Sequence, residues 1–342
     1  MENQNQDMSG TIERTFDVSL FRPDDAEGVS RLFRAVHGDE YPIKLFYNPR
    51  QLIKANDEGD YYSTVARSTE GEIIGIHNLF RSAPSPDVYE WGVGLVLKEW
   101  RSQGVSGEIE KFMMKNVIPR LGMHTVFGEP VTNHVSMQKK GVEHGYHVTA
   151  IEMGLMPGEA YSGEGVTSAR VSTLLFFRIF KNISQDVFIP EPYRDELQFM
   201  YGRFSNGRVF HESTSSLSGE IVSRSKMDIF DFAKVARIAF HDVGSDFSQK
   251  IEQLELEALK KGSIVIQVWF KLTSPSVGEV VRILQGRGYF LGGLLPQWFD
   301  DDGILMQKLL FSPDFESIKL HSEDSKKIAE FVRSDWLRTS SK

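Results

Sequence analysis

The pattern of apolar and polar positions divides the first half of the chain into short strands and helices. Val29, Leu32, Phe33 and Val36 recur at the spacing of one helix face, which predicts a helix that buries them together. Apolar runs between turn-forming residues predict strands around it. The expected elements are a strand at 16–21, helices at 24–37 and 48–55, strands at 62–68, 72–80 and 88–97, a helix at 106–117, a strand at 125–129, a helix at 134–144 and a strand at 146–156.

The second half repeats the end of this series. Gly288-Tyr289 lies 143 residues after Gly145-Tyr146, and the same offset places residues 131–133 on 274–276. A recurrence at one fixed separation indicates a duplicated unit. The elements expected there are a strand at 264–270, a helix at 276–285, a strand from Gly288 and a charged amphipathic helix at 322–337.

The length of the chain agrees with two domains. At 342 residues it exceeds the size at which a single hydrophobic core usually keeps growing. The mixture of strands and helices predicts an α/β fold with a mixed α+β sheet. A stretch rich in Gly, Ser and Glu ends at residue 168 and marks a boundary. We expect a flexible tail at 1–12, a first domain at 13–158, a linker at 159–168, a second domain at 169–311 and a C-terminal segment with a helix at 312–342.

Composition narrows the class of protein. Lys and Arg number 39 against 47 Asp and Glu, and the net charge of −8 disfavours a nucleic-acid partner because phosphate backbones attract basic surfaces. No apolar run reaches the roughly 20 residues that span a bilayer, and the polar N-terminus lacks the features of a signal peptide. The absence of cysteine excludes disulfides, thiolate metal ligands and a cysteine nucleophile. We therefore expect a cytoplasmic protein that binds neither nucleic acid nor membranes.

A turn of small residues connects the strand at 88–97 to the next helix. It reads Arg101-Ser102-Gln103-Gly104-Val105-Ser106-Gly107. The unpaired N–H groups of a first helical turn converge on an anion, and the helix dipole favours its charge. Gly104 allows close backbone approach, and Arg101 adds a cation beside it. The turn can therefore cradle a pyrophosphate, although a Gly/Ser turn between a strand and a helix is often only a tight connection.

Residues 95–106 resemble the pyrophosphate-binding signature of the GNAT acyltransferase superfamily, Arg/Gln-x-x-Gly-x-Gly/Ala. The resemblance covers residues 16–156 well and the second half only in its closing strand-helix-strand. Ser106 departs from the signature and adds a hydroxyl donor. The resemblance implies a GNAT-like N-acetyltransferase fold in two tandem copies, with acetyl-CoA as co-substrate and no metal. It also implies that backbone groups of Leu95 and Leu97, on a splayed strand, hold the pantetheine arm. The implied coenzyme-binding residues are Leu95, Val96, Leu97, Arg101, Ser102, Gln103, Gly104, Val105, Ser106, Gly107 and Asn133.

Two residues are candidates for a general base. Glu90 shares a strand face with Gly92 and Gly94, where missing side chains would leave open space, and many GNAT enzymes carry a catalytic Glu on this strand. His134 follows Asn133, at the turn where the family places an Asn on the coenzyme arm. A base is needed because a lysine-like amine, with a pKa of about 10.4, must lose a proton before it attacks. Two plain alternatives stay open: Glu90 as a solvated strand residue, and His134 as a surface residue beside a helix cap.

Other positions depart from the family pattern. The family's usual acid, a Tyr four residues before the closing Gly-aromatic pair, is replaced by Gly141. The 143-residue offset sends Gly104 to Phe247, in a segment where Asp242 and Asp246 would repel a pyrophosphate, so we expect no coenzyme in the second half. The run 300–302, Asp-Asp-Asp before Gly303, is expected to be a solvated hairpin turn rather than a metal site.

Three hypotheses for the function remain from the sequence. The first is an N-acetyltransferase that moves an acetyl group from acetyl-CoA to an amine of a small molecule or peptide by direct attack in a ternary complex. The alternative is a non-catalytic sensor or scaffold that binds acyl-CoA, and an enzyme with a longer acyl or aminoacyl donor is a third reading. The sequence leaves open the acceptor and whether the chain forms a homodimer.

Overall fold

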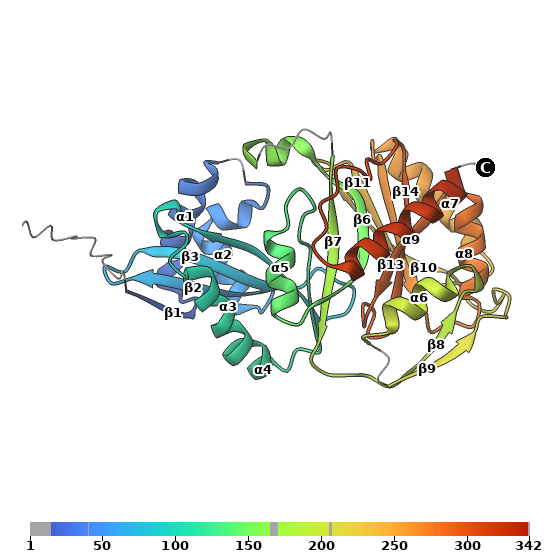
Figure 1. Cartoon of the computed structure of the whole chain (residues 1–342), viewed down its shortest axis with the longest axis horizontal. Coiled ribbons are helices and arrows are strands. Elements are labelled where there is room, and N and C mark those ends of the chain that lie inside the picture. Colours follow the sequence, from blue (N-terminus) through green and yellow to red (C-terminus); the bar gives the residue numbers. More distant parts are fainter. Residues whose placement is uncertain (1–14, 40, 165–169, 205–206, 341–342) are drawn as a thin grey trace, which may run out of the picture. The chain divides into compact units, whose positions relative to one another are not determined.

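The computed structural model describes residues 15–39, 41–164, 170–204 and 207–340 (Figure 1). The predicted tail at 1–12 and the last residues of the predicted linker lie outside this part. Contacts divide the chain into two compact units: residues up to Phe80 together with Trp91–Gly122, and Arg81–Glu90 together with the chain from Met123 onward. The predicted domain boundaries follow the repeat of elements rather than these units, and they stay a prediction.

The first unit is built on antiparallel strands. β1 (Phe16–Leu20), β2 (Tyr61–Ser68) and β3 (Ile73–Phe80) pair in that order. The later residues of β4 (Val88–Val96) also belong to this unit. Its helices are α1 (Ala26–His37), α2 (Pro49–Asp57), α3 (Val105–Phe112) and α4 (Ile118–Leu121).

The helix face predicted for α1 is buried. Val29, Leu32 and Phe33 are almost inaccessible to solvent, and the ring of Phe33 stacks on Phe46 with 4.3 Å between centroids. Burial of each such side chain contributes roughly 1.5–3 kcal/mol to folding. The apolar stripe therefore accounts for the packing of α1 in the core of the first unit.

The second unit contains a larger mixed sheet. Its order is β5-β7-β6-β13-β14-β12-β11-β10, and the first residues of β4 pair in parallel with β5. A separate parallel pair, β8–β9, accompanies it. The strands are β5 (Thr125–Gly128), β6 (His147–Pro157), β7 (Arg170–Ile179), β8 (Gln185–Ile189), β9 (Arg208–Glu212), β10 (Arg224–Phe230), β11 (Val235–Asp242), β12 (Val265–Lys271), β13 (Phe290–Leu295) and β14 (Gly303–Leu309).

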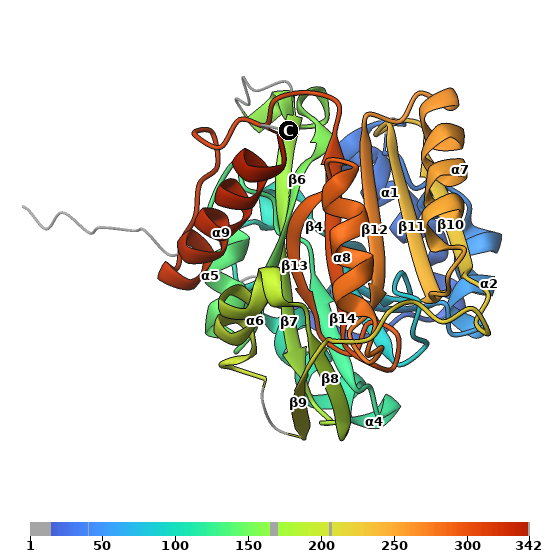
Figure 2. The same cartoon turned by 90° about the vertical axis from the view of Figure 1, so that its right-hand side faces the viewer.

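Helices cover the sheet of the second unit. They are α5 (Ser136–Glu143), α6 (Arg194–Tyr201), α7 (Phe247–Lys260), α8 (Val277–Gly286) and α9 (Glu323–Ser340). Helix α9 packs against β6 and β13 (Figure 1), and α6, α8 and α9 lie over the same face of the sheet (Figure 2). No helix in the described residues is both long and apolar enough to cross a membrane.

The strand order of the second unit is symmetric about its centre. The series β5-β7-β6 is followed by its mirror, β13-β14-β12, and a helix precedes each central strand: α5 before β6 and α8 before β13. The central strands join at Ala150 and Gly293, which are separated by the same 143 positions found in the sequence. This is the pattern that a duplicated unit with a local two-fold axis would give.

The structure confirms the expected mixed α/β class and most of the expected elements, with two differences in helices. Helix α5 begins at Ser136, so His134 lies in the preceding loop. The helix expected at 106–117 is α3, which ends at Phe112 and continues as a π-helical stretch over Met113–Val117.

The acidic run between β13 and β14 is not a wholly solvated turn, contrary to the prediction. Asp302 is fully buried and pairs with Arg208, with 3.0 Å between Nη2 and Oδ1, and the hydroxyl of Tyr201 donates to its second oxygen at 2.9 Å. A buried carboxylate needs such partners because desolvation disfavours its charge. Within the described residues, no group of three or more acidic or His side chains could hold a metal.

Candidate functional site

Strand β4 is distorted at Val93, two positions before the first predicted coenzyme-binding residue. Val93 has φ 51°, a left-handed backbone that is rare for a β-branched residue. The side-chain amide of Asn78 donates to its carbonyl at 2.9 Å, and Ser63 donates to Asn78 at 2.6 Å. Strain of this kind persists only where the surroundings fix it, and it clusters at functional sites.

The turn after β4 presents open backbone donors. Gly104 is the N-cap of α3 with φ 82°, a conformation that favours glycine. A Cβ on Gly104 or Gly107 would meet no atom within 4 Å. Apart from bonds within helix α3, no backbone acceptor among the described residues receives a hydrogen bond from the N–H groups of Gly104, Val105 or Gly107. Open N–H groups at a helix start form the kind of site that binds a phosphate.

Exposed side chains hold the outer part of this turn. The side-chain amide of Gln103 donates to the Glu99 carbonyl at 2.6 Å, and Nε of Arg101 donates to the Val96 carbonyl at 3.3 Å. Ser102 adopts φ 62°. The guanidinium of Arg101 lies at the surface, where it can meet an anion bound to the turn.

The hydroxyl of Ser106 points into the unit rather than toward a ligand on the turn. It donates to Oε1 of the buried Glu110 at 2.8 Å and lies 3.2 Å from Nε2 of His77. The indole N–H of Trp91 donates to Nδ1 of His77 at 3.0 Å, which assigns the proton of the neutral ring to Nε2. The phosphate contact that the sequence suggested for this hydroxyl is therefore replaced by a polar network below the turn.

Two expectations for β4 are corrected by the packing of the first unit. The space expected at Gly94 is filled by the imidazole of His77, which would lie 2.7 Å from a Cβ there. Leu97 has no open N–H for a coenzyme, because this group donates to the Ile74 carbonyl at 2.9 Å. Leu95 is buried and Val96 is partly buried.

The second unit contains a group of three carboxylates: Glu129 and Glu152 pair with Arg237, and Glu90 contacts Ser82. Ser82 donates to Oε2 of Glu90 at 2.7 Å. Nη2 of Arg237 lies 3.2 Å from Oε1 of Glu129 and 2.9 Å from Oε1 of Glu152. The side chain of Glu90 is partly buried, and the alternative of a solvated strand residue stays open.

Burial and like charge shift the acid–base behaviour of the cluster. The pKa of Glu90 is raised to about 7, first by burial and also by the Glu152 charge, while Ser82 and Arg237 act in the opposite direction. The pKa of Glu129 is raised well above its usual range by burial and then by Glu152. A carboxylate with a pKa near 7 suits a general base at neutral pH.

The sequence analysis did not single out the buried ion pair between Arg237 and Glu152. Arg237 is a charged residue inside the apolar strand β11, and Glu152 stands in the same way inside β6. Charged residues in buried strands are usually paired, so each was a signal. The pairing between them could not be read, because it depends on how β6 and β11 come together across the sheet.

Asn133 and His134 lie in the loop before α5. The loop is held by Thr132, whose hydroxyl donates to the Ser172 carbonyl at 2.9 Å, and by Gln138, whose amide donates to the His134 carbonyl at 3.1 Å. The N-cap of α5 is Val135, which makes no side-chain cap hydrogen bond, so neither Thr132 nor Asn133 caps this helix. Both Asn133 and His134 are partly buried.

In the corresponding turn of the second half, backbone N–H groups donate to acceptors within the chain itself. The N–H of Gly244 donates to Ser223 Oγ at 3.0 Å, and that of Ser245 to the Ser218 carbonyl at 2.9 Å. Asp246 accepts the N–H of Ser223 at 2.9 Å. The segment 218–223 thus takes the N–H groups of Gly244 and Ser245, just before α7, which gives a physical reason for the prediction that this half binds no coenzyme.

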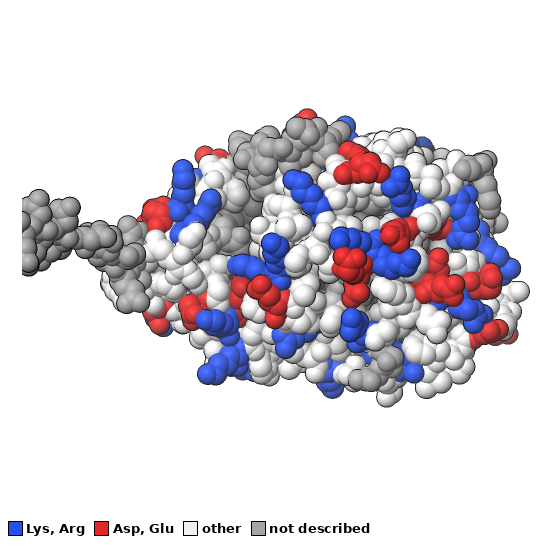
Figure 3. All heavy atoms as spheres, viewed as in Figure 1, with Lys and Arg blue, Asp and Glu red and all other residues white. Residues whose placement is uncertain are grey.

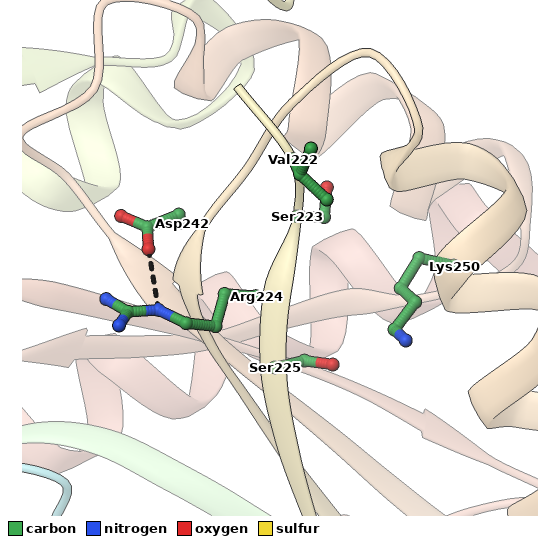
Figure 4. A pocket seen from close by; sticks show the side chains of 6 residues that line it. All are labelled: Val222, Ser223, Arg224, Ser225, Asp242 and Lys250. Carbon is green, nitrogen blue, oxygen red and sulfur yellow. Dashed lines mark hydrogen bonds and ion pairs between the residues drawn. The ribbon is translucent and has the colours of Figure 1, made fainter. Parts of the chain in front are cut away.

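An open hollow of about 620 Å³ shares Ser223 with this turn (Figure 4). Arg224 pairs with Asp242 at 2.8 Å, and Lys250 extends from α7 toward β10. On the described part of the face in Figure 3, acidic and basic side chains are interspersed. The charges on the face in Figure 3 therefore do not indicate another site. The hollow is lined by Val222, Ser223, Arg224, Ser225, Asp242 and Lys250.

No protein-family model and no curated protein matches the chain. Several solved acetyltransferases are similar to about half of it. An acetyltransferase of the GNAT family from Staphylococcus aureus is 12% identical, with 49% of this chain and 100% of that chain covered and a TM-score of 0.35. A ribosomal-protein alanine acetyltransferase from Vibrio fischeri is 14% identical, with 48% and 92% covered and a TM-score of 0.39. A spermidine/spermine N-acetyltransferase from Vibrio cholerae is 10% identical, with 48% and 92% covered and a TM-score of 0.37.

Proposed function

We propose that the chain is a cytoplasmic N-acetyltransferase with two tandem GNAT-like halves, of which the first binds acetyl-CoA. It moves the acetyl group to an amine of a small molecule or peptide by direct attack in a ternary complex. The similar solved acetyltransferases are named for acceptors as different as a ribosomal protein and spermidine. They leave the acceptor of this chain open.

The observation that carries the proposal is the open turn at Gly104. Support for a pyrophosphate there comes from the N–H groups of Gly104 and Val105, which have no backbone acceptor outside helix α3, and from the space at Gly104 and Gly107, which no side chain fills. The coenzyme supplies an activated acetyl thioester. Arg101 would add a cation to the phosphate contacts made by the turn.

Glu90 is the residue we propose as the general base. Its carboxylate takes a proton from the ammonium form of the acceptor, and the neutral amine then attacks the thioester carbonyl. The new C–N bond forms as the C–S bond breaks, and the thiolate takes up a proton as it leaves. Asn133 stays a candidate contact for the coenzyme arm and His134 a second candidate base.

Calorimetric titration with acetyl-CoA tests the proposal. The expected result is one equivalent per chain for the native protein and no detectable binding for Gly104→Asp, whose carboxylate would enter the phosphate space. Gly262→Asp is a matched control, since Gly262 also has φ 82° and open space at its Cβ position. Loss of binding in both variants, or in neither, would contradict a site at Gly104.

One observation favours the alternative of a non-catalytic acyl-CoA sensor. Gly141 stands where the family's general acid is expected, and a Cβ there would lie 2.6 Å from the ring of Phe176, so a larger side chain does not fit. Release of free CoA thiol over a panel of polyamines and peptide amines separates the two functions. Binding of one equivalent without thiol release from any amine would favour the sensor.

A further inference from the structure

Strand β10 is the edge of the mixed sheet in the second unit. In the part of the chain that the structure describes, it pairs on one side with β11, and no strand pairs with its other side. Figure 2 shows β10 at this edge, beside α7. The outer backbone N–H and C=O groups of an edge strand are a template for a further strand. β10 can therefore accept one more partner.

The first half of the chain has a strand at the corresponding place. β4 pairs in parallel with β5, as β11 does with β12, and the next strand outward is β3 in the first half and β10 in the second. On its outer side β3 pairs antiparallel with β2. Among the described residues the second half has no counterpart of β2 in this sheet. The outer side of β10 thus lacks the antiparallel strand that β3 has.

The side chains of β10 alternate between an exposed and a half-buried face. Arg224, Lys226, Asp228 and Phe230 are exposed, whereas the residues between them are half-buried. On the exposed face, Nζ of Lys226 lies 2.9 Å from Oδ2 of Asp228. These opposite charges flank Met227 on either side. The strand is therefore complementary in charge to a reversed copy of itself.

We propose that β10 pairs antiparallel with β10 of a second copy of the chain, with Met227 of both protomers on the two-fold axis. In this register Lys226 of one protomer lies opposite Asp228 of the other, and the symmetry repeats the pair on the far side of the axis. Opposite charges that face each other across an antiparallel pair stabilise it, and like charges destabilise it. The interface is thus specific for a second copy.

Exposed apolar side chains at both ends of β10 support the same arrangement. Val222, before the strand, is 76% exposed, and Phe232, after it, is 54% exposed. Because the start of one strand lies beside the end of the other, Val222 of one protomer faces toward Phe232 of its partner. The hollow of about 620 Å³ that Val222 and Arg224 line leaves room there for an aromatic ring (Figure 4). Pairing would remove these apolar side chains from water.

Sedimentation equilibrium of the full-length chain tests the charges. Asp228→Lys places two lysines opposite each other on both sides of the axis, and it should raise the dimer dissociation constant by about tenfold or more. The double variant Lys226→Asp/Asp228→Lys restores both pairs with their charges exchanged, and it should return the constant to near the native value. Glu323→Lys is the matched control, since Glu323 forms an exposed pair with Lys326 on α9, which packs on β6 and β13. This control should leave the constant unchanged.

Disulfide cross-linking tests the register. The chain has no cysteine, so Met227→Cys supplies a single thiol. Opposed Cα atoms of an antiparallel pair are about 4.5–5.5 Å apart, a distance that a disulfide spans. Ser225→Cys is the matched control, because the two copies of this half-buried position would lie about 13 Å apart along the strands, too far for a disulfide. Oxidation should link the first variant much faster than the second.

None of these measurements depends on acetyl transfer, so the proposal stands or falls apart from the proposed function. A native chain that stays monomeric up to its solubility limit overturns it, and the charges of β10 would then serve to keep copies apart. A dimer that is unaffected in folded Asp228→Lys, or equal cross-linking rates in the two thiol variants, would place the interface elsewhere and overturn it as well.

Discussion

The two strand-to-helix turns of this chain differ in what their backbone donors bind. At Gly104 the N–H groups at the start of α3 lie open, and a side chain at that position would meet no atom within 4 Å. At Gly244 a Cβ would lie 1.7 Å from the Ile221 carbonyl oxygen, because the chain itself covers the turn. A helix start that satisfies its donors with its own chain has none left for a phosphate. A repeated fold can therefore keep its topology while its ligand site is lost through a local segment.

The halves also differ in how they would enter catalysis. The first offers a turn for a coenzyme and the candidate base Glu90. The second contains Arg237, which pairs with Glu129 and Glu152. These differences between the two halves can be tested by substitution.

The largest effect is expected from alanine at the two glycines of the turns. Gly244→Ala forces a Cβ into the Ile221 backbone and should lower the free energy of unfolding by about 3 kcal/mol. Gly104→Ala meets no atom and should cost only about 1 kcal/mol for its left-handed backbone. Urea denaturation measures both. Equal losses would show that the two turns do not differ in packing.

The next effect concerns the base. Glu90→Gln keeps the shape of the side chain and removes its proton acceptor, so turnover should fall by about 100-fold while acetyl-CoA affinity is retained. In the native protein kcat/KM should rise with pH through about 7 as Glu90 loses its proton. Steady-state kinetics over pH 5–9 measure both. Glu110→Gln is the control, because Glu110 is also a buried carboxylate that accepts a serine hydroxyl.

The pH dependence of the free energy of unfolding tests the raised pKa of Glu90 independently of catalysis. Folding raises the pKa of Glu90 to about 7, so its contribution to stability is full below its unfolded pKa near 4.5 and is lost as pH rises through 7. Glu90→Gln should therefore lose less stability than the native protein between pH 5 and 8. Parallel curves for the two proteins would contradict the raised pKa.

A smaller effect is expected at Ser106 in the first turn. Ser106→Ala leaves Glu110 and His77 without its hydroxyl and should cost about 1.5 kcal/mol of stability. Since that hydroxyl points away from the ligand side, acetyl-CoA affinity should stay within about twofold, less than one ordinary hydrogen bond. Thermal denaturation and calorimetry measure the two quantities. A clear loss of affinity with unchanged stability would show that the hydroxyl serves the coenzyme.

Much of the fold could be predicted from local signals. The apolar stripe of α1 predicts a helix in its own segment, and the small residues at 101–107 predict a turn in theirs. The 143-residue offset predicts the repeat, and the two central strands pair at Ala150 and Gly293, which are separated by that same offset. The network of Ser106 and the ion pairs of Arg237 could not be predicted, because each joins residues far apart in the sequence. The buried Asp302 shows the same limit, since an acidic run in a sequence does not reveal which of its carboxylates meets an arginine.

The smallest effect should come from the acidic residue that closes the second turn. Hydrogen bonds from the Ser223 side chain and then its backbone lower the pKa of Asp246. Its contribution to stability is therefore present above its unfolded pKa near 3.8 and is lost as pH falls through the folded value. Asp246→Asn should cost about 1 kcal/mol at pH 7, the size of one hydrogen bond, and less as pH falls below 3.8. Asp242→Asn, which breaks only the surface pair with Arg224, should cost less than about 0.5 kcal/mol at either pH. If Asp246→Asn behaved like Asp242→Asn, the segment 218–223 would be held over the turn by something other than this carboxylate, and the closed state of the second turn would need another cause.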